Sequence, residues 1–262
     1  MGDFELSKWY ADCVTETGDA RILYSAELRW HGFAIHYANL LTHRAGRPIS
    51  SRFSLRRQPP PAVRDGLIEW KSRAWHAEGA WSEAGIGLRE MLFDSPAGRL
   101  EWDCLAPRAT AELRVRREQP FRGWGYVERL RLSLPPWCLP IRELRWGRFI
   151  NATDALVWID WRGPHNRQVT YHNGAAVRAE RIDDREIVLA DGGAVLSLDR
   201  GVVLREGLLG STALAVVPNL DRLFPSRMLR VHERKWLSRG VLRRPGLPDS
   251  VGLAIHEVVE WP

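Results

Sequence analysis

Alternation of apolar and polar residues with a period of two runs through most of this 262-residue chain, and it limits the possible folds more than any other feature. In RILYSAELRW (21–30), Tyr24 and Leu28 share one face, while Glu27 lies on the other. Because successive side chains of a strand point to opposite faces, the pattern predicts a β-strand with one buried face. His31-Gly32 then turns the chain into a second alternating run, GFAIHYANLL, which predicts a hairpin.

Turn signals separate further runs of this kind. Pro-Ala-Gly interrupts FDSPAGRLEW (93–102), Asn173-Gly174 has the strongest two-residue hairpin sequence, and Asp191-Gly192-Gly193 repeats the pattern. Helical periodicity is confined to 217–228, where we expect one short helix before Pro225 ends it. The sequence therefore predicts an all-β fold of antiparallel barrels or sandwiches.

The chain also divides into two parts. The proline-rich stretch SLPPWCLPIRELRWGRF predicts a linker over 133–149, between an N-terminal β-domain (1–132) and a C-terminal β-domain (150–262). The two parts share an echo, because Gly123 and Gly252 each precede a glutamate by five residues within an apolar strand. We therefore expect two related β-units, each with a glycine-bearing strand where the sheet bends sharply.

Charge and composition limit the partners. The net charge is +6, but arginines alternate with Asp and Glu, as in RIDDRE, and form no continuous basic stripe. We therefore expect no nucleic-acid partner and keep a nucleic-acid-binding barrel as a minor alternative. No apolar run is long enough to span a membrane, although peripheral contact with one remains open. The three cysteines are widely spaced, which indicates reduced thiols and a cytoplasmic location.

Thirteen tryptophans and a few embedded acids stand out; for most of the tryptophans, packing in the core and at the barrel ends is the better interpretation, and an aromatic-lined cavity is the functional alternative. Small barrels can enclose one ligand, and a carboxyl in such an apolar cavity has a raised pKa and can act as a general acid. Four acids lie in aromatic strand contexts: Asp12, Glu128, Asp160 and Glu257. The structural alternative for each is an outward-facing or arginine-paired carboxylate. Metal-site and nucleotide-binding motifs are missing from the sequence, so we expect no cofactor and no metal.

Several stretches together resemble the carotenoid 1,2-hydratase (hydroxyneurosporene synthase) and AttH-like superfamily, to which tocopherol cyclases and some fungal Diels–Alderases are similar. They are KWYADCVTETGDARILYSAELRW, GWGYVE, RWGRF followed by ALVWIDW, and GLAIHEVVEW. The resemblance implies two tandem lipocalin-like (calycin-type) domains and a hydrophobic ligand. In enzymes of the group it also implies acid chemistry on alkenes without a cofactor. The residues that would line such a cavity are Tyr10, Tyr24, Trp124, Tyr126, Trp146, Trp158 and His256.

Two functions follow from these observations. In the first, a buried acid, Glu128 or Asp160 before Asp12 or Glu257, assists hydration, cyclisation or isomerisation of an isoprenoid or polyene, which would make the protein a cofactor-independent lyase or isomerase. In the second, the same cavity carries a lipid or isoprenoid and catalyses nothing. Fold-level analogy does not choose between them, and we favour the enzyme slightly. The sequence indicates neither the substrate nor the oligomeric state.

Overall fold

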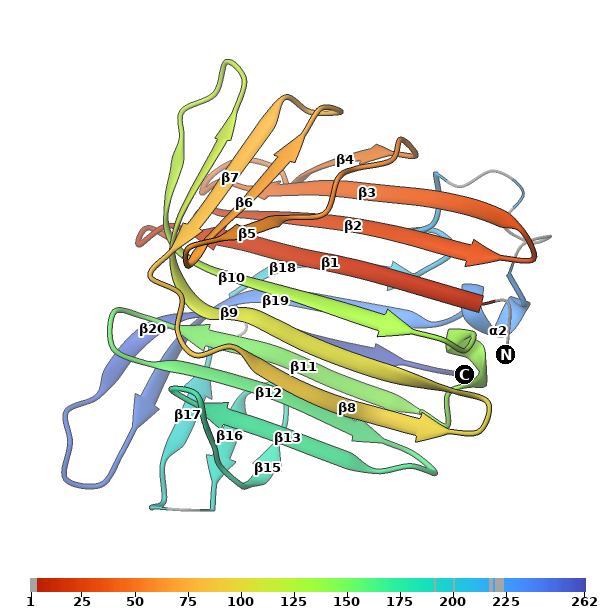
Figure 1. Ribbon diagram of the computed structural model, residues 1–262. Coiled ribbons are helices and arrows are strands. Elements are labelled where there is room, and N and C mark those ends of the chain that lie inside the picture. Colours follow the sequence, from red (N-terminus) through yellow and green to blue (C-terminus); the bar gives the residue numbers. More distant parts are fainter. Residues whose placement is uncertain (1–3, 191, 200, 217–218, 220–223) are drawn as a thin grey trace. The chain divides into compact units, whose positions relative to one another are not determined.

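A computed structural model describes residues 4–190, 192–199, 201–216, 219 and 224–262 (Figure 1). The chain forms two compact units, Met1–Pro136 and Trp137–Pro262. Each unit contains one antiparallel sheet of ten strands. The all-β prediction is therefore confirmed.

The sheet of the N-terminal unit has the strand order β4-β3-β2-β1-β10-β9-β7-β6-β5, with β8 added on β9. Its strands are β1 (Phe4–Val14), β2 (Ala20–Trp30), β3 (Phe33–His43), β4 (Ser50–Ser54), β5 (Ala62–Arg64), β6 (Leu67–Ser72), β7 (Ala77–Ser82), β8 (Leu88–Ser95), β9 (Gly98–Val115) and β10 (Phe121–Leu132). The long strand β9 bends strongly (Figure 1), so that its first half pairs with β8 and its second half with β7.

The sheet of the C-terminal unit repeats this order with every strand number raised by ten. Its strands are β11 (Glu143–Ile150), β12 (Ala155–Arg162), β13 (Arg167–His172), β14 (Ala175–Ala176), β15 (Ala179–Ile182), β16 (Glu186–Leu189), β17 (Val195–Leu198), β18 (Val202–Leu208), β19 (His232–Arg243) and β20 (Ser250–Glu260). The glycine–glutamate echo falls on β10 and β20, which occupy the same place in the two sheets. The expectation of two related units is therefore confirmed.

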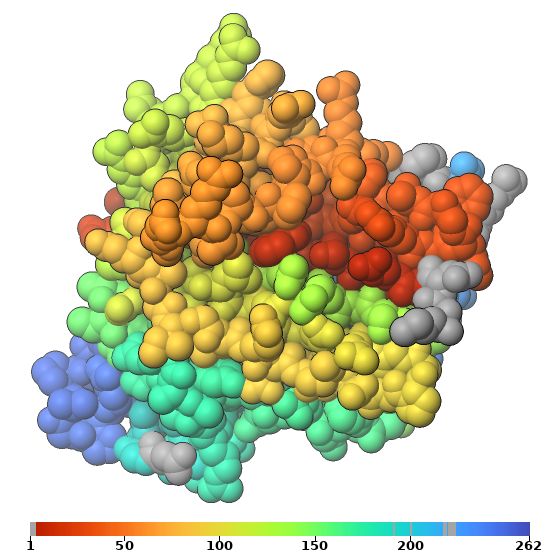
Figure 2. Space-filling view, viewed as in Figure 1, coloured from red at the N-terminus to blue at the C-terminus, as the bar shows by residue number. Residues whose placement is uncertain are grey.

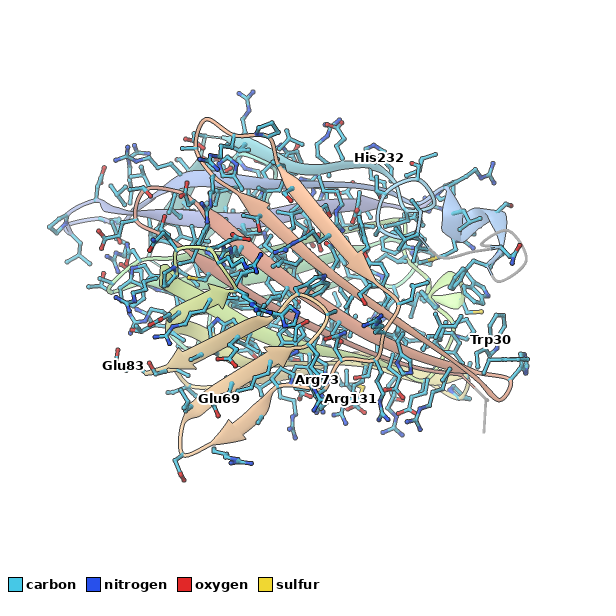
Figure 3. The ribbon with its side chains drawn as sticks, turned by 90° about the horizontal axis from the view of Figure 1, so that it is seen from above. Trp30, Glu69, Arg73, Glu83, Arg131 and His232 are labelled. Carbon is cyan, nitrogen blue, oxygen red and sulfur yellow. The ribbon has the colours of Figure 1, made fainter. Side chains whose placement is uncertain are left out.

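Local turn chemistry determines the hairpins as predicted. His31 and Gly32 both have positive φ, 47° and 78°, and join β2 to β3. This two-residue connection fits the right-handed twist of the flanking strands, and Figure 3 shows Trp30 beside the tip. Asn173 and Gly174, with φ of 50° and 83°, join β13 to β14 in the same way.

Two expectations differ from the structure. Residues 143–149, which we expected in the linker, form most of β11, because the alternation of ELRWGRF continues through the basic residues; the connection keeps only a 3₁₀ turn, η1 (Pro136–Cys138). The helix expected before Pro225 falls mostly on 217–218 and 220–223, which lie outside the described residues. The described helix α2 (Ser226–Leu229) begins after Pro225.

Most of the tryptophans predicted for core packing have that role. In the N-terminal unit Trp70, Trp75 and Trp81 pack with small residues of β1, β9 and β10, among them Ala11 and Val127. In the C-terminal unit Trp158 packs in the core together with Phe149 and Leu196. The interior side of each sheet is therefore defined, and the position of any other strand residue follows from its register.

Candidate functional site

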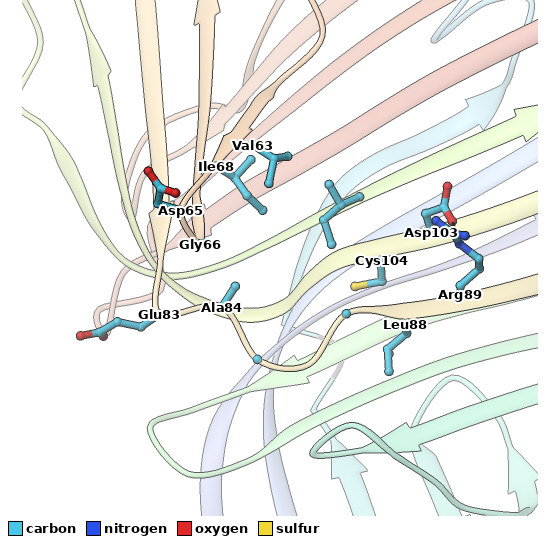
Figure 4. A pocket seen from close by; sticks show the side chains of 13 residues that line it. Val63, Asp65, Gly66, Ile68, Glu83, Ala84, Leu88, Arg89, Asp103 and Cys104 are labelled. Carbon is cyan, nitrogen blue, oxygen red and sulfur yellow. Dashed lines mark hydrogen bonds and ion pairs between the residues drawn. The ribbon is translucent and has the colours of Figure 1, made fainter.

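Two adjoining cavities lie on the interior side of the N-terminal sheet. The larger, of about 860 Å³, is lined by Val63, Ile68, Leu88 and Leu105 among others. Figure 4 shows Val63 and Ile68 on one side of it, with Leu88, Arg89 and Asp103 on the other. The smaller, of about 540 Å³, is lined by Ser7, Trp9, Ser25, Glu27, Arg57, Gln58, Pro60, Pro61, Val63, Arg89, Asp103, Leu105 and Arg129. Because four residues line both cavities, they form one continuous hollow.

The segment 55–66 borders this hollow and supplies Pro60, Pro61 and Val63 to it. Most of its side chains, apart from Gln58 and Pro61, are exposed at the surface of the N-terminal unit, within the orange surface of Figure 2. Val63, which lines both cavities, is 55% exposed. Ile86, in the loop that lines the larger cavity, is 75% exposed. Apolar side chains therefore lie at the opening as well as inside it.

Asp103 is the charged centre of the hollow. It is 5% exposed and accepts hydrogen bonds from Arg89 (Nε to Oδ1, 2.7 Å) and Arg129 (Nη2 to Oδ2, 2.9 Å), while Arg131 lies 3.4 Å away. Burial raises the pKa of the Asp103 carboxyl, but the hydrogen bonds from Arg129 and Arg89 outweigh burial and hold the pKa below its usual value. Asp103 is therefore ionised near neutrality and does not act as a general acid.

Glu128 belongs to an aromatic cluster on the opposite face of the same sheet. Its Oε2 accepts hydrogen bonds from Tyr126 Oη at 2.7 Å and from Trp102 Nε1 at 2.5 Å. Burial raises the pKa of the Tyr126 hydroxyl well above its usual value, and Cys104 and Glu128 raise it further, so the hydroxyl keeps its proton and donates it. The two donors fix the position of the Glu128 carboxyl group.

Asp12 belongs to the same face. Tyr10 Oη donates to Asp12 Oδ2 at 2.8 Å, and the rings of Tyr24 and Tyr126 meet the Tyr10 ring edge-on, at 5.2 and 5.9 Å between centroids. Asp12 is fully buried, as are Tyr10 and Tyr126. The structure thus brings together five of the predicted residues, Tyr10, Asp12, Tyr24, Tyr126 and Glu128, with Trp124 on the same face.

Strand register places this cluster on the face of the sheet opposite to Trp9 and Asp103, and Cys104, which pairs with Glu128 and also lines the larger cavity, lies at the boundary between them. Tyr10 pairs with Glu128 and Asp12 with Tyr126, whereas Ala11 pairs with Val127, and both of the latter belong to the core. Side chains of successive residues point to opposite faces. The acids expected on a cavity wall therefore face away from the cavities, and none of the eleven predicted site residues lines either one.

In the C-terminal unit Asp160 belongs to an ion-pair network. Its Oδ2 accepts a hydrogen bond from Arg162 Nε at 2.7 Å, and Arg162 Nη2 forms an ion pair with the same oxygen at 2.6 Å. Arg162 also donates to Glu143 at 2.9 Å, and Glu143 accepts from Arg145 at 2.5 Å. Arg145 in turn pairs with Asp184. Asp160 is 7% exposed, so it has the environment of a structural, arginine-paired carboxylate.

The other predicted residues of the C-terminal unit are also in packed surroundings. Glu257 pairs with Lys235, which is 1% exposed and lies 5.2 Å from the Trp146 ring centroid. His256 stacks on Trp236, with 5.0 Å between centroids, and its Nε2 lies 2.9 Å from Ser238 Oγ. Trp158, 6.5 Å from the His256 ring, belongs to the core.

The duplicated register relates the lining of the smaller cavity to the ion-pair network of the C-terminal unit. If Glu128 is matched with Glu257, the strand pairs Ser7–Glu27 and Trp9–Ser25 correspond to Glu143–Arg162 and Arg145–Asp160. The first set lines the 540 Å³ cavity, whereas the second set forms the ion-pair network. Long charged side chains therefore fill in one unit the positions that line the hollow in the other.

Sequence reasoning missed the residues that line the hollow, chiefly Trp9, Arg89, Asp103 and Arg129. A signal was available in KWYADC: alternation places Trp9 and Ala11 on one face and Tyr10 and Asp12 on the other, and the small Ala11 indicates the core side. In the part of the chain that the structure describes, no group of three or more His, Cys, Asp or Glu side chains is arranged to hold a metal ion. No helix among these residues is long and apolar enough to cross a membrane.

Comparison with known proteins was made at the level of sequence and of structure. No protein-family model matches the sequence, and no curated protein matches it. Solved structures do match: CghA crystallised with Sch210972 has a TM-score of 0.59 at 13% identity, over 98% of this chain and 89% of that one. Kievitone hydratase from Nectria haematococca has a TM-score of 0.56 at 11% identity, over 97% and 88%.

An AttH-like protein from Nitrosomonas europaea has a TM-score of 0.53 at 11% identity, over 97% of this chain and 92% of that one. These matches extend over nearly the whole chain, and at such low identity they establish the fold alone. The fold agrees with the superfamily-level resemblance, without distinguishing its members. The chain therefore has the fold of these proteins, two lipocalin-like units in tandem.

Proposed function

We propose that the protein binds a hydrophobic small molecule of isoprenoid or polyene type in the hollow of its N-terminal unit. The observation that carries this proposal is the pair of adjoining cavities, about 860 and 540 Å³, which share Val63, Arg89, Asp103 and Leu105. Volumes of this order are typical of small-molecule sites. Ile68, Leu105 and Trp9 supply the apolar contacts for the body of the ligand.

Arg129 indicates which polar group the other end of the ligand carries. Arg129 uses Nη2 to bind Asp103, while its buried Nε–H has no acceptor among the described residues. A buried donor without an acceptor costs about 1–3 kcal/mol, so a ligand oxygen at this place gains that free energy. We therefore propose an amphipathic ligand, with an apolar body and a hydroxyl, carbonyl or carboxylate oxygen near Arg129.

Binding of all-trans-retinol, a polyene alcohol, tests this proposal through quenching of tryptophan fluorescence. We expect saturable binding, tighter than that of the oxygen-free polyene β-carotene. Arg129→Met should weaken retinol binding about tenfold, since a hydrogen bond to a charged group is worth about 1.5–3 kcal/mol, and should leave β-carotene unaffected. Arg239→Met, on an exposed strand position of the C-terminal unit, is the matched control. If retinol does not saturate the protein, or if Arg129→Met binds like wild type, the proposed site is wrong.

A second candidate function is acid–base chemistry at Glu128, which would make the protein a lyase or isomerase of the hydratase or cyclase type. The Tyr126 and Trp102 hydrogen bonds favour it, because they hold a carboxylate in place to accept a proton or stabilise positive charge. The name of one similar structure, kievitone hydratase, agrees with hydration as the reaction.

Mass spectrometry distinguishes the two candidates. The molecule that co-purifies with the protein from its host is identified, and fresh molecule is incubated with wild type and with Glu128→Gln. A carrier returns it unchanged in both cases. An enzyme releases a product, and Glu128→Gln should stop product formation while the ligand is still retained. The three cysteines are free thiols, which agrees with the cytoplasmic location that we propose for either function.

A further inference from the structure

Three arginines converge on one carboxylate in the N-terminal unit, apart from the hollow. Glu118, in the loop between β9 and β10, pairs through Oε2 with Arg21 from β2 and with Arg44, 3.2 Å away, after β3. Arg52 from β4 lies 3.6 Å from Glu118 Oε1. One carboxylate therefore serves three guanidinium groups.

Arg21 is the buried member of this cluster. It is 0% exposed, stacks 3.9 Å from the centroid of the Phe121 ring, and donates to the backbone carbonyl of Leu113 at 3.2 Å. Its Nε–H has no acceptor among the described residues. Burial lowers the pKa of Arg21; Glu118 counters this effect, while Arg44 and Arg52 lower the pKa further. The cluster thus holds more positive charge than its own acid neutralises.

A cavity of about 590 Å³ adjoins the cluster and shares Glu118 with it. Lys71, Arg73 and Arg116 line this cavity, and none of the three forms an ion pair within the described parts of the chain. Arg114 also lines it but pairs with Glu112, and the other carboxylate of the lining is Glu78. Six cations are therefore set against two carboxylates: Arg21, Arg44, Arg52, Lys71, Arg73 and Arg116 against Glu78 and Glu118.

We propose that this basic cluster and its cavity form a binding site for a multiply charged phosphate-bearing anion, of the diphosphate type. Guanidinium forks match the oxygens of a phosphate, and close arginines repel one another unless an anion lies between them. The cations outnumber the carboxylates by more than one charge, so a single monovalent anion would not neutralise the cluster. The cavity is also large enough for a phosphate ester. None of these residues lines the ligand hollow, so this site is independent of the proposed function.

The test is the thermal midpoint of the wild-type protein in pyrophosphate, in orthophosphate, and in sodium chloride of equal ionic strength. We expect pyrophosphate to raise the midpoint most, because it meets several arginines at once, and sodium chloride to raise it least. Co-sedimentation with phosphatidylglycerol vesicles distinguishes a lipid headgroup from a free phosphate compound: sedimentation that pyrophosphate displaces identifies the headgroup as a ligand of this site. If pyrophosphate does no more than sodium chloride, the site does not exist.

Substitutions separate anion binding from a purely structural cluster. Arg44→Gln and Arg52→Gln, at partly exposed positions, should each weaken pyrophosphate binding about tenfold. Arg239→Gln on the C-terminal unit should bind as wild type does. Glu118→Gln is the sharpest test: it removes the competing carboxylate, so the variant should be less stable without anion but bind pyrophosphate more tightly. If Glu118→Gln is less stable and gains no affinity for pyrophosphate, or if the two arginine variants bind pyrophosphate as wild type does, the cluster has only a structural role and binds no anion.

Discussion

Replacement of Asp160 by asparagine tests the role of the ion-pair network in the C-terminal unit. The carboxylate accepts one charge-assisted hydrogen bond from Arg162 Nε, at 2.7 Å, and forms an ion pair with Nη2 at 2.6 Å; a hydrogen bond of this kind is worth about 1.5–3 kcal/mol when buried. The Arg162 side chain is 41% exposed, so solvent reduces this value, and asparagine keeps one acceptor oxygen. We therefore expect Asp160→Asn to lower the free energy of unfolding by about 1–2 kcal/mol.

A loss of that size corresponds to a fall in the thermal midpoint of about 2–8 °C for a protein of this size, measured by differential scanning calorimetry. Glu143→Gln, in the same network, should behave similarly because Glu143 accepts from Arg145 and Arg162. Retinol binding in the N-terminal unit should be unchanged in both variants. If Asp160→Asn keeps its thermal midpoint but abolishes turnover of the co-purified ligand, Asp160 is a catalytic acid and the structural interpretation is refuted.

Three further predictions concern the N-terminal unit. Trp9→Ala should weaken retinol binding about tenfold or more by fluorescence titration, because the indole lines the cavity, whereas Trp30→Ala at the hairpin tip should not; equal effects would argue against the hollow. Asp103→Asn should cost about 2 kcal/mol at pH 7 and flatten the loss of stability in acid denaturation curves. The lowered pKa of Asp103 means that its contribution is present above the unfolded value near 4 and is lost as the pH falls through the folded value. Gly123→Ala should cost about 3 kcal/mol or more, because a Cβ would lie 2.0 Å from a backbone carbonyl oxygen of β1, while Gly85→Ala, with 3.5 Å to its nearest neighbour, should be tolerated in the same unfolding assay.

The fold could be predicted because its determinants are local. Alternation identifies strands without reference to their partners, and His31-Gly32 and Asn173-Gly174 adopt the positive φ values that short hairpins require. The duplication was also visible, because Gly123 and Gly252 allow close strand approach: a Cβ at these glycines would lie 2.0 and 2.6 Å from a carbonyl oxygen of the neighbouring strand. Each of these features depends on a few residues that are neighbours in the chain, so it can be recognised from a single sequence.

The site was harder to predict because it depends on which face of a strand is interior. Alternation shows correctly that Tyr126 and Glu128 share a face, and the structure joins them by a hydrogen bond. It does not say which face meets the core, and aromatic residues occur on both, since Trp81 is on the interior side and Tyr126 on the other. The prediction assigned most tryptophans to core packing but the aromatic residues beside the embedded acids to a cavity wall, whereas Tyr10 and Tyr126 are also densely packed.

Comparison of the two units shows which interior positions line a cavity and which are filled by packed side chains. In both sheets a glycine at the same place lets the neighbouring strand approach closely, so β10 and β20 keep their pattern. The interior positions near one end of β2 and β12 are not constrained in this way. In the C-terminal unit they hold Asp160 and Arg162 in a network that stabilises the sheet, and in the N-terminal unit Ser25 and Glu27 border a cavity instead. Since one unit shows that ion pairs can fill these positions, the hollow in the other is not a requirement of the fold, and this difference supports the ligand binding that we propose for it.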